Sequence, residues 1–202
     1  MRLHFSSQSP YVRKVMIVAW ELGCLSAIET VPAAAHPVQR NAALIALNPL
    51  GQIPALELAD GHVLYDSRVI CEYLNEICGG AIVPAAGPAR WRALTEQSLG
   101  DGMLAAALLA RYETAARPPK LQWQDWVDGQ LDKADTGLAA IERDAAGLAD
   151  RTDIGTITLA CALGYLDLRF PDFGWRSRFP GIAEWEMRFG ERPSLKATRP
   201  AP

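Results

Sequence analysis

The chain has 202 residues, of which 50% are hydrophobic and 21% charged, and its formal net charge is −3 at pH 7. This composition predicts a folded globular protein, since disordered chains carry fewer apolar residues and a higher net charge. Charges of both signs are spread along the sequence, no run approaches the roughly 18 apolar residues of a membrane span, and the chain starts without a signal peptide's apolar core. We therefore expect a cytoplasmic protein that binds neither nucleic acid nor membrane.

The first part of the chain predicts a strand followed by a helix. Residues 2–5 read as a short strand, and the polar loop after them ends at Ser9 and Pro10, where a serine can cap a helix and a proline can begin it. The apolar residues that follow recur every three or four positions, as on the buried face of a helix, and Gly23 ends the pattern. The members of this apolar stripe are Val12, Val15, Met16, Ala19 and Leu22.

The next segments complete the order βαβαββα. They are a strand over residues 28–31, a helix over 41–47, strands over 54–58 and 62–65, and a helix over 67–77. The two later strands are joined by Asp60 and Gly61, a common hairpin turn. One βαβ unit followed by a hairpin and a helix implies a four-stranded mixed sheet with helices on both sides. This is the thioredoxin-like arrangement, so we expect an α/β fold here.

Residues 79–87 are rich in Gly, Pro and Ala and predict a linker between two domains. We expect a thioredoxin-like domain over residues 1–78 and an all-helical domain over residues 88–202. The helical patterns of the second domain cover residues 89–116, 121–146, 153–169 and 182–189. The third pattern has few polar residues, which predicts a central helix, and Asp153 with Thr156 has the spacing of a capping box at its start.

The four cysteines are too few and too scattered for a disulfide framework, and no spacing of Cys and His suits a zinc site. We therefore expect no bound metal. We interpret the cysteines as small buried apolar residues. They are Cys24, Cys71, Cys78 and Cys161.

Three short segments carry the chemistry that the sequence suggests. In the first, Ser9 stands at a helix N-terminus, where backbone N–H groups and the helix dipole favour an anion. A hydroxyl there can donate to a thiolate, lower the pKa of the thiol and keep a nucleophile ready near neutral pH. On spacing alone, a plain helix cap is the more frequent role of such a serine.

The second segment, residues 48–56, has two prolines around a glycine turn that leads into a strand. We expect the bond before Pro54 to be cis, which turns the backbone of Ile53 outward. An exposed N–H and C=O at Ile53 can pair with an extended peptide as an added strand would. The alternative is an ordinary turn followed by an edge-strand proline.

The third segment, Asp66-Ser67-Arg68, stands at the start of a helix. The hydroxyl and the helix N-terminus suit a carboxylate, whereas Asp66 suits an ammonium group. Side by side, they suit the α-amino-acid end of a ligand. Each residue taken alone would more often be a plain N-cap.

Together these segments resemble the motifs of the soluble glutathione transferase superfamily. Residues 48–56 are similar to its N-P-x-G-x-[IV]-P-x-L motif, and residues 66–74 are similar to its [ED]-S-x-x-I-x-x-Y-L motif. The loop over residues 6–14 is most similar to bacterial members with S-P-[FY]-x-R-K at this point. The central helix departs from the family pattern, because Asp153 and Thr156 stand where Ser or Thr and then Asp are usual.

The resemblance implies that the chain binds glutathione as a co-substrate. Ile53 would pair with the cysteinyl backbone of glutathione, and Asp66 with Ser67 would hold its γ-glutamyl end. Ser9 would be the catalytic residue, which stabilises the thiolate. Because the loop around Ser9 contains no cysteine, disulfide exchange through it is disfavoured. The full set of expected glutathione-binding residues is Ser9, Gln52, Ile53, Pro54, Asp66 and Ser67.

Further residues are weaker candidates for the site. Ser7 is the nearest alternative to Ser9 as the thiol activator, and Tyr11 is a weaker alternative because it lies inside the helix. His36 and Arg40 fall in or after a loop near the expected glycine carboxylate of glutathione.

Two more candidates lie on the first long helix of the second domain. Asp101 stands between two glycines in an apolar stretch. The resemblance implies that it reaches the ligand amine in a neighbouring subunit; the alternative is that it lines a polar interface. Arg111 would face the acceptor cleft or form surface pairs.

The first-choice function is that of a glutathione transferase, which adds the thiolate of glutathione to a small, apolar electrophile. The helical domain would supply an apolar acceptor pocket between the domains. The alternatives are a glutathione-dependent peroxidase or lyase at the same site, or a non-catalytic interaction scaffold with this fold. The resemblance also implies a homodimer, for which the apolar helix around residues 94–109 offers a contact face.

Overall fold

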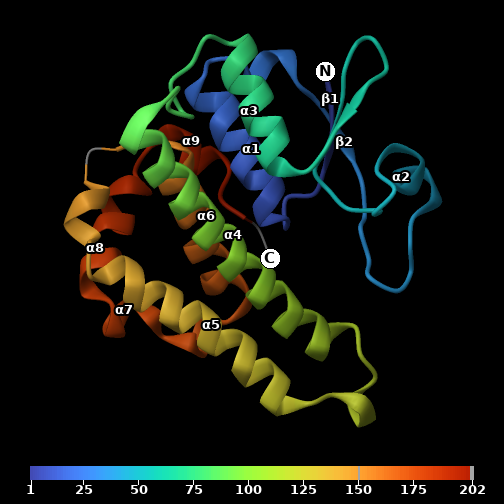
Figure 1. Ribbon diagram of the computed structural model, residues 1–202. Helices are drawn as coiled ribbons and strands as arrows, with labels where there is room; N and C mark the ends of the chain where they lie inside the picture. The colour runs from blue at the N-terminus through green and yellow to red at the C-terminus, as the bar shows by residue number, and fades with distance from the viewer. Residues whose placement is uncertain (150, 201–202) are drawn as a thin grey trace.

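Figure 1 shows a small sheet with its own helices beside a larger group of helices. The structure, a computed structural model, describes residues 1–149 and 151–200. Its strands are β1 (Arg2–Phe5), β2 (Glu29–Pro32), β3 (Ala55–Glu57) and β4 (Val63–Leu64), in the sheet order β2-β1-β3-β4. β1 and β2 run parallel, whereas β3 runs antiparallel to both β1 and β4. This mixed sheet confirms the predicted fold class of the N-terminal domain.

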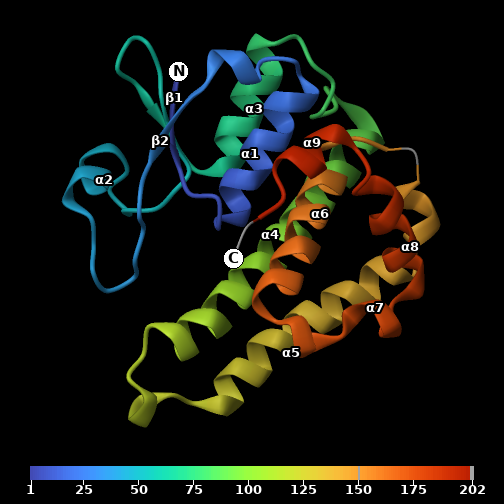
Figure 2. The same cartoon turned by 180° about the vertical axis from the view of Figure 1, so that it is seen from behind.

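Helices lie on both sides of the sheet, as predicted. α1 (Pro10–Glu21) and α3 (Ser67–Ile77) pack together on one side, and α2 (Ala42–Leu47) lies on the other (Figures 1 and 2). The element order βαβαββα is the predicted one. The two hairpin strands are shorter than predicted, because pairing between them is confined to two residues on each strand.

The remaining helices form the C-terminal domain. They are α4 (Gly87–Ala115), α5 (Gln124–Glu142), α6 (Ile154–Arg169), α7 (Trp175–Arg178), α8 (Pro180–Phe189) and α9 (Pro193–Ala197). α4 begins one residue before the expected start of the helical domain. α5 is shorter than predicted because short 3-10 turns, at Pro119–Leu121 and Ala145–Leu148, take the place of its ends. The sequence does not predict α7 and α9, since helices of 4 and 5 residues are too short to show a repeat.

α6 is buried along most of its length, as its apolar sequence predicts. The predicted capping box begins it: Asp153 Oδ1 accepts hydrogen bonds from the N–H groups of Gly155 and Thr156 at 3.0 and 3.1 Å. The Thr156 hydroxyl in turn accepts from the Asp153 N–H at 3.1 Å. The other carboxylate oxygen of Asp153 pairs with Arg151, which also binds Glu96 of α4. The cap therefore also ties α6 to α4.

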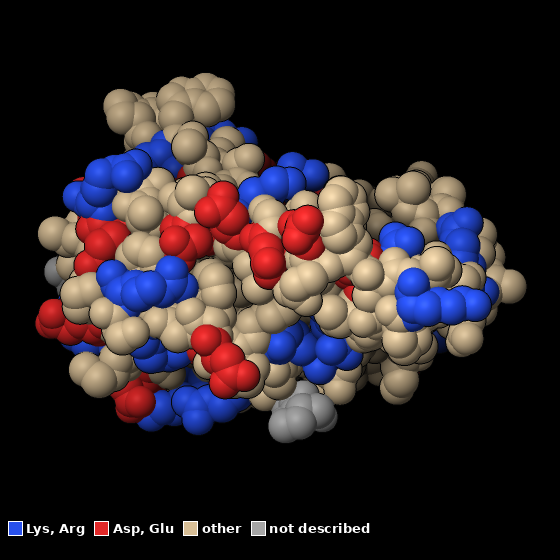
Figure 3. All heavy atoms as spheres, turned by 90° about the horizontal axis from the view of Figure 1, so that it is seen from below, with Lys and Arg blue, Asp and Glu red and all other residues tan. Residues whose placement is uncertain are grey.

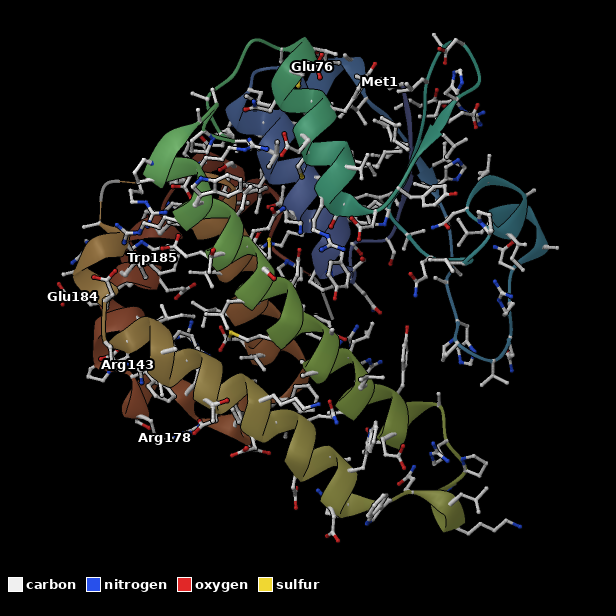
Figure 4. All side chains as sticks on the ribbon, in the orientation of Figure 1. Met1, Glu76, Arg143, Arg178, Glu184 and Trp185 are labelled. Atoms are coloured by element: carbon white, nitrogen blue, oxygen red, sulfur yellow. The ribbon has the colours of Figure 1, made fainter. Side chains whose placement is uncertain are left out.

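α1 is enclosed by both domains. α3 covers it within the N-terminal domain, and α6 and α9 cover it from the C-terminal domain. Side chains fill the space between α1, α4 and α6 (Figure 4). Ile17 and Val18 are therefore buried along with the predicted Val12 and Val15, whereas Met16 is only partly buried. The buried face of α1 is therefore wider than the predicted apolar stripe, because the second domain covers a further side of the helix.

Charges of both signs are mixed on the surface. Basic and acidic side chains lie interspersed on the face that Figure 3 shows, and some of them form ion pairs, such as that of Arg176 with Glu186 at 2.9 Å. None of the helices in the described ranges is long and apolar enough to cross a bilayer. The mixture matches the spread of charges along the sequence.

The two glycines beside Asp101 provide a matched test of how closely α4 approaches α6. A Cβ on Gly100 would lie 2.9 Å from Thr158 Cγ2 and 3.2 Å from the Thr158 carbonyl carbon, whereas a Cβ on Gly102 would meet no atom within 4 Å. We expect Gly100→Ala to lower the free energy of unfolding by about 1–3 kcal/mol through overpacking. Gly102→Ala should leave it unchanged or raise it by up to about 1 kcal/mol, because alanine is the better helix former. Urea unfolding followed by circular dichroism measures both, and equal effects would contradict the close contact of α4 with α6.

Candidate functional site

The three segments that the sequence singles out meet at one end of the sheet. His4 of β1 pairs with Ala55 of β3, and Leu56 of β3 pairs with Leu64 of β4. Because both pairs of strands are antiparallel, the loop after β1, the start of β3 and the end of β4 lie at the same end. The residues brought together there are Ser9, Ile53, Pro54, Asp66 and Ser67.

Ser9 is the N-cap of α1. Its Oγ accepts a hydrogen bond from the Val12 N–H at 3.3 Å, and its backbone is extended. A serine hydroxyl has one proton and two lone pairs, so accepting in the cap leaves the O–H available to donate. The helix cap and a role toward an anion at the N-terminus of α1 are therefore compatible. Ser7, the alternative activator, is exposed in the loop before it.

A buried asparagine shapes the turn before β3. Asn48 Nδ2 donates to the carbonyl of Gln52 at 2.9 Å, and Gly51 between them has φ +65°, a conformation that favours glycine. The Ile53–Pro54 bond is cis, which confirms that prediction. Pro54 is buried, Ile53 is half-buried and Gln52 is exposed, so the backbone before β3 runs at the surface.

Asp66 is the N-cap of α3 and pairs with Arg68. Its Oδ1 accepts from the Arg68 N–H at 2.9 Å, and Arg68 Nη2 lies 3.0 Å from its Oδ2. Burial by itself would raise the pKa of Asp66, but hydrogen bonds from Arg68 and the charges of Arg68 and Lys14 lower it below its ordinary value. The carboxylate is therefore charged at neutral pH. Ser67, which follows it, is buried at the start of the helix.

The sequence does not predict the deepest charge beside the site, Lys14. Its side chain is 0% exposed, and its Nζ lies 2.7 and 2.9 Å from the two carboxylate oxygens of Asp101. α1 carries the lysine and α4 carries the aspartate, so this ion pair joins the two domains. A lysine next to the apolar stripe of a helix is ordinarily exposed. Only the packing of the second domain against α1 accounts for its burial.

Asp101 directs both carboxylate oxygens at Lys14 of its own chain. Its side chain remains 15% exposed. A ligand amine in a neighbouring subunit would therefore have to share a carboxylate that an ion pair already holds. The cross-subunit role of Asp101 stays a prediction.

Tyr11 lies beside Asp101, and its hydroxyl donates to the Asp101 backbone carbonyl at 3.5 Å. Burial raises the pKa of the Tyr11 phenol well above its ordinary value, and the charges of Asp101 and Asp66 raise it further. Tyr11 therefore stays protonated at neutral pH and cannot act as a base toward a thiol. Its one proton is directed at α4, so it is poorly placed as the activating group.

His36 and Arg40 are exposed and shape the backbone around them. His36 Nδ1 accepts from the N–H groups of Val38 and Gln39 at 3.2 and 2.9 Å. Arg40 Nη2 donates to the Pro49 carbonyl at 2.8 Å and so supports the turn before β3. A ligand role for either residue remains a prediction.

Arg111 is half-buried near the C-terminal end of α4. Arg117, just after the helix, pairs with Glu113 at 2.8 Å. Arg111, in contrast, pairs with no acidic side chain of residues 1–149 and 151–200. The expected surface pairs of Arg111 are therefore not found in the described part of the chain.

Comparison with known proteins decides the family. The model for the glutathione S-transferase N-terminal domain matches residues 8–77, and that for the C-terminal domain matches residues 124–186. The GST-like protein YibF of Escherichia coli (strain K12) is 30% identical over 205 residues, which cover 99% of this chain and 98% of YibF. The chain belongs to the glutathione S-transferase family.

Solved structures of the glutathione transferase family have the same architecture. A family member from Pseudomonas fluorescens Pf-5 with bound glutathione is 47% identical, with a TM-score of 0.97 over 100% of this chain and 99% of that chain. Another structure of a family member from this organism, with bound S-(propanoic acid)-glutathione, is 46% identical, with a TM-score of 0.92 over 100% of both chains. A glutathione S-transferase from Methylobacillus flagellatus KT with bound glutathione is 32% identical, with a TM-score of 0.86 over 99% of each chain. The predicted fold is thus confirmed.

The cysteines of this glutathione transferase-family chain are free thiols. Burial raises the pKa of Cys71 to about 12 and that of Cys161 to about 11. Burial, together with the neighbouring Cys78, raises the pKa of Cys24 to about 12. Thiols with raised pKa are weak nucleophiles near neutral pH. Cys71 and Cys161 are buried as predicted, whereas Cys24 and Cys78 are partly exposed. Among the described residues, no group of His, Cys, Asp and Glu side chains is arranged to hold a metal ion.

The Lys14–Asp101 pair yields a test of what holds the two domains together. We expect Asp101→Asn to lower the free energy of unfolding by about 3–5 kcal/mol, because it leaves the Lys14 ammonium buried without a counter-charge. Lys14→Met should cost less, since the Asp101 carboxylate is 15% exposed and water can reach it. The double variant should be more stable than Asp101→Asn alone, because no charge stays buried. Urea unfolding of the four proteins completes the double-mutant cycle, and additive effects would contradict a direct interaction.

Proposed function

We propose that this protein is a glutathione transferase that adds the glutathione thiolate to a small electrophile. Membership of the family, and relatives solved with bound glutathione, support a glutathione site where Ser9, Ile53 and Asp66 meet. Residues 1–78 would bind glutathione, and residues 88–202, after the linker, would bind the electrophile. A cytoplasmic location is part of the proposal.

The observation that carries the proposal is the available proton of the Ser9 hydroxyl at the N-terminus of α1. Because Oγ accepts from the Val12 N–H, its O–H can point outward to a sulfur. The N–H groups and dipole of this 12-residue helix add positive potential at the same place. Both effects favour the thiolate and lower the thiol pKa. The sequence from Ser9 to Lys14 also supports this role by its similarity to bacterial members with S-P-[FY]-x-R-K.

Glutathione would lie along the start of β3 and the N-terminus of α3. Its cysteinyl backbone would pair antiparallel with the main chain of Ile53, between Gln52 and Pro54. Its γ-glutamyl ammonium would bind Asp66, which Arg68 keeps charged. Its γ-glutamyl carboxylate would bind at Ser67 and the helix N-terminus.

The reaction forms one bond, between the glutathione sulfur and the electrophilic carbon. The thiol proton passes to solvent when the thiolate forms. In a substitution, the leaving group departs with its bonding electron pair; in an addition to a double bond, the pair moves to the neighbouring carbon, which takes a proton from water. The relative bound to S-(propanoic acid)-glutathione holds a glutathione substituted on sulfur. This supports a site that accepts a substituent on the glutathione sulfur, as transfer requires.

Removal of the Ser9 hydroxyl tests the proposal. Ser9→Ala should raise the pKa of the bound glutathione thiol by about one to two units, since a hydrogen bond to a charged group is worth about 1.5–3 kcal/mol. Turnover at neutral pH should fall by about ten- to a hundredfold and recover in part as the pH rises. The Kd of glutathione should change much less, because most contacts lie at Ile53 and Asp66. Titration of the thiolate absorbance measures the pKa.

Three further variants distinguish the effect of the Ser9 hydroxyl on the thiol from its effect as a helix cap. Ser9→Thr keeps both and should keep the low thiol pKa, whereas Ser9→Gly keeps most of the cap but lacks the donor and should behave as Ser9→Ala. Ser7→Ala should change neither the pKa nor the rate. If Ser9→Ala and Ser9→Gly change neither, Ser9 is only a helix cap, and the activator is Ser7, Tyr11 or the backbone of the turn.

We also propose a homodimer that forms on the outer face of α3 and α4. A hollow of about 630 Å³ on this face is lined mainly by α4, and Trp91, one of its lining residues, is 67% exposed. An adjoining hollow of about 380 Å³ includes Arg68 and Val69 of α3. Gly102 opens onto the same face. Exposed apolar patches of this kind mark interaction sites, and a second copy seated here would lie beside the proposed γ-glutamyl site.

Sedimentation at micromolar concentration tests the dimer. The wild-type protein should sediment as twice the chain mass of 22.0 kDa. Gly102→Arg, which places a long charged side chain in the open space of the hollow, should shift the protein toward monomer. Met187→Arg, at a 66% exposed position of α8, is the matched control and should not. A wild-type mass of one chain would overturn both the dimer and the cross-subunit role of Asp101.

A further inference from the structure

The register of α4 against α6 places two arginines on the facing sides of these helices. These helices run side by side in the same direction, with Gly100 packed against Thr158, as Figure 2 shows from behind. An α-helix completes three turns in about eleven residues. Residues eleven positions further along both helices therefore face each other again. The residues at those positions are Arg111 and Arg169.

The electrostatics of a buried tyrosine support this placement. Tyr165 lies one turn before Arg169 on α6 and is buried. Burial raises its pKa, and the charges of Arg111 and Arg169 both oppose that rise. Tyr165 in turn raises the pKa of Tyr11, which follows Ser9 by two residues. These opposing charges agree with a position of both guanidinium groups near the Tyr165 phenol.

Neither arginine has an acidic partner in the part of the chain that the structure describes. Arg169 Nη2 donates to the side-chain carbonyl of Gln8 at 2.8 Å, and its buried Nε makes no hydrogen bond within the described ranges. Arg111 has no ion pair with residues 1–149 or 151–200. Two like charges at one place repel each other, and a carboxylate between them would satisfy both.

The bond from Arg169 to Gln8 connects these arginines to the proposed thiol site at Ser9. Gln8, which Arg169 holds, is the residue directly before Ser9. The Arg169 guanidinium is thus attached to the loop that carries the proposed thiol activator. The Tyr11 hydroxyl, two residues after Ser9, also bonds to the backbone of α4 at Asp101. An electrophile whose carbon meets the sulfur at Ser9 would extend toward Arg111 and Arg169.

We propose that Arg111 and Arg169 bind a carboxylate on the electrophile, so that the preferred substrates are small acidic electrophiles rather than purely apolar ones. This rests on the proposed glutathione transferase function. The sulfur bonds to the electrophilic carbon of the acid, and either a leaving group departs with its electron pair or the adjacent carbon takes a proton from water. The arginines hold the carboxylate and take no part in making or breaking bonds.

Product analogues test whether the site binds a carboxylate on the electrophile, and they do so without depending on turnover. The Kd values of S-(carboxymethyl)glutathione and of S-(carbamoylmethyl)glutathione, its uncharged analogue of similar size, are measured by calorimetry, and the pair with one more methylene is measured in the same way. The wild-type protein should bind the acid at least about tenfold more tightly than the amide in one of the two pairs, as expected for charge-assisted hydrogen bonds. Equal affinity for acid and amide in both pairs would overturn the inference.

Variants test whether the two arginines cause the tighter binding of the acid than of the amide. Arg111→Met and Arg169→Met should each reduce the acid-to-amide ratio by about tenfold or more, while the Kd of glutathione itself stays within about twofold. Arg143→Met, an exposed arginine at the far end of α5 (Figure 4), is the control and should leave the ratio unchanged. If Arg143→Met lowers the ratio as much, or the two test variants leave it unchanged, the arginines only support the Gln8 loop and the inference fails. If the wild-type protein does not bind glutathione, the proposed function itself is rejected.

Discussion

The buried ion pair of Lys14 with Asp101 is the interaction on which the arrangement of the site depends. Its lysine belongs to the helix that begins at Ser9, and its aspartate belongs to the helix that carries Arg111. A buried charge without its partner is strongly unfavourable, so the pair is satisfied only when the two domains are docked in one way. Gly100 lets α4 approach α6 closely next to Asp101. Close packing of three helices thus determines where the start of α1 lies against the C-terminal domain.

The helix caps of the N-terminal domain begin their helices and also keep groups available to bind a ligand. Ser9 uses a lone pair to cap α1, which leaves its proton available, and Asp66 caps α3 while Arg68 keeps it charged. A helix cap must lie at the end of a helix, and this is also where backbone N–H groups favour anions. Finding a plain cap at these positions is therefore no evidence against a binding site.

Features that depend on local sequence could be predicted, and features that depend on contact between domains could not. The strand and helix order, the capping box of Asp153 with Thr156 and the cis bond before Pro54 each follow from residues close together in the chain. The burial of Lys14 and the bond from Arg169 to Gln8 join residues 87 and 161 positions apart. The sequence contains no local pattern that pairs them, because only the docking of α1 against α4 and α6 brings them together.

The two ends of the α4–α6 interface show why the facing arginines call for an external anion. At one end, Arg151 is neutralised by Glu96 and Asp153, at 2.6 and 2.8 Å. At the other end, Arg111 and Arg169 have no such acids within the described residues. The dipole of α6 stabilises the positive charge of Arg169, which lies in the last turn of the helix, by about 0.3–1 kcal/mol. Arg111 lacks this stabilisation because it lies before the last turn of α4. An arginine needed only to join these helices would be expected to resemble Arg151, so the unbalanced charge is better explained by a ligand that brings its own carboxylate.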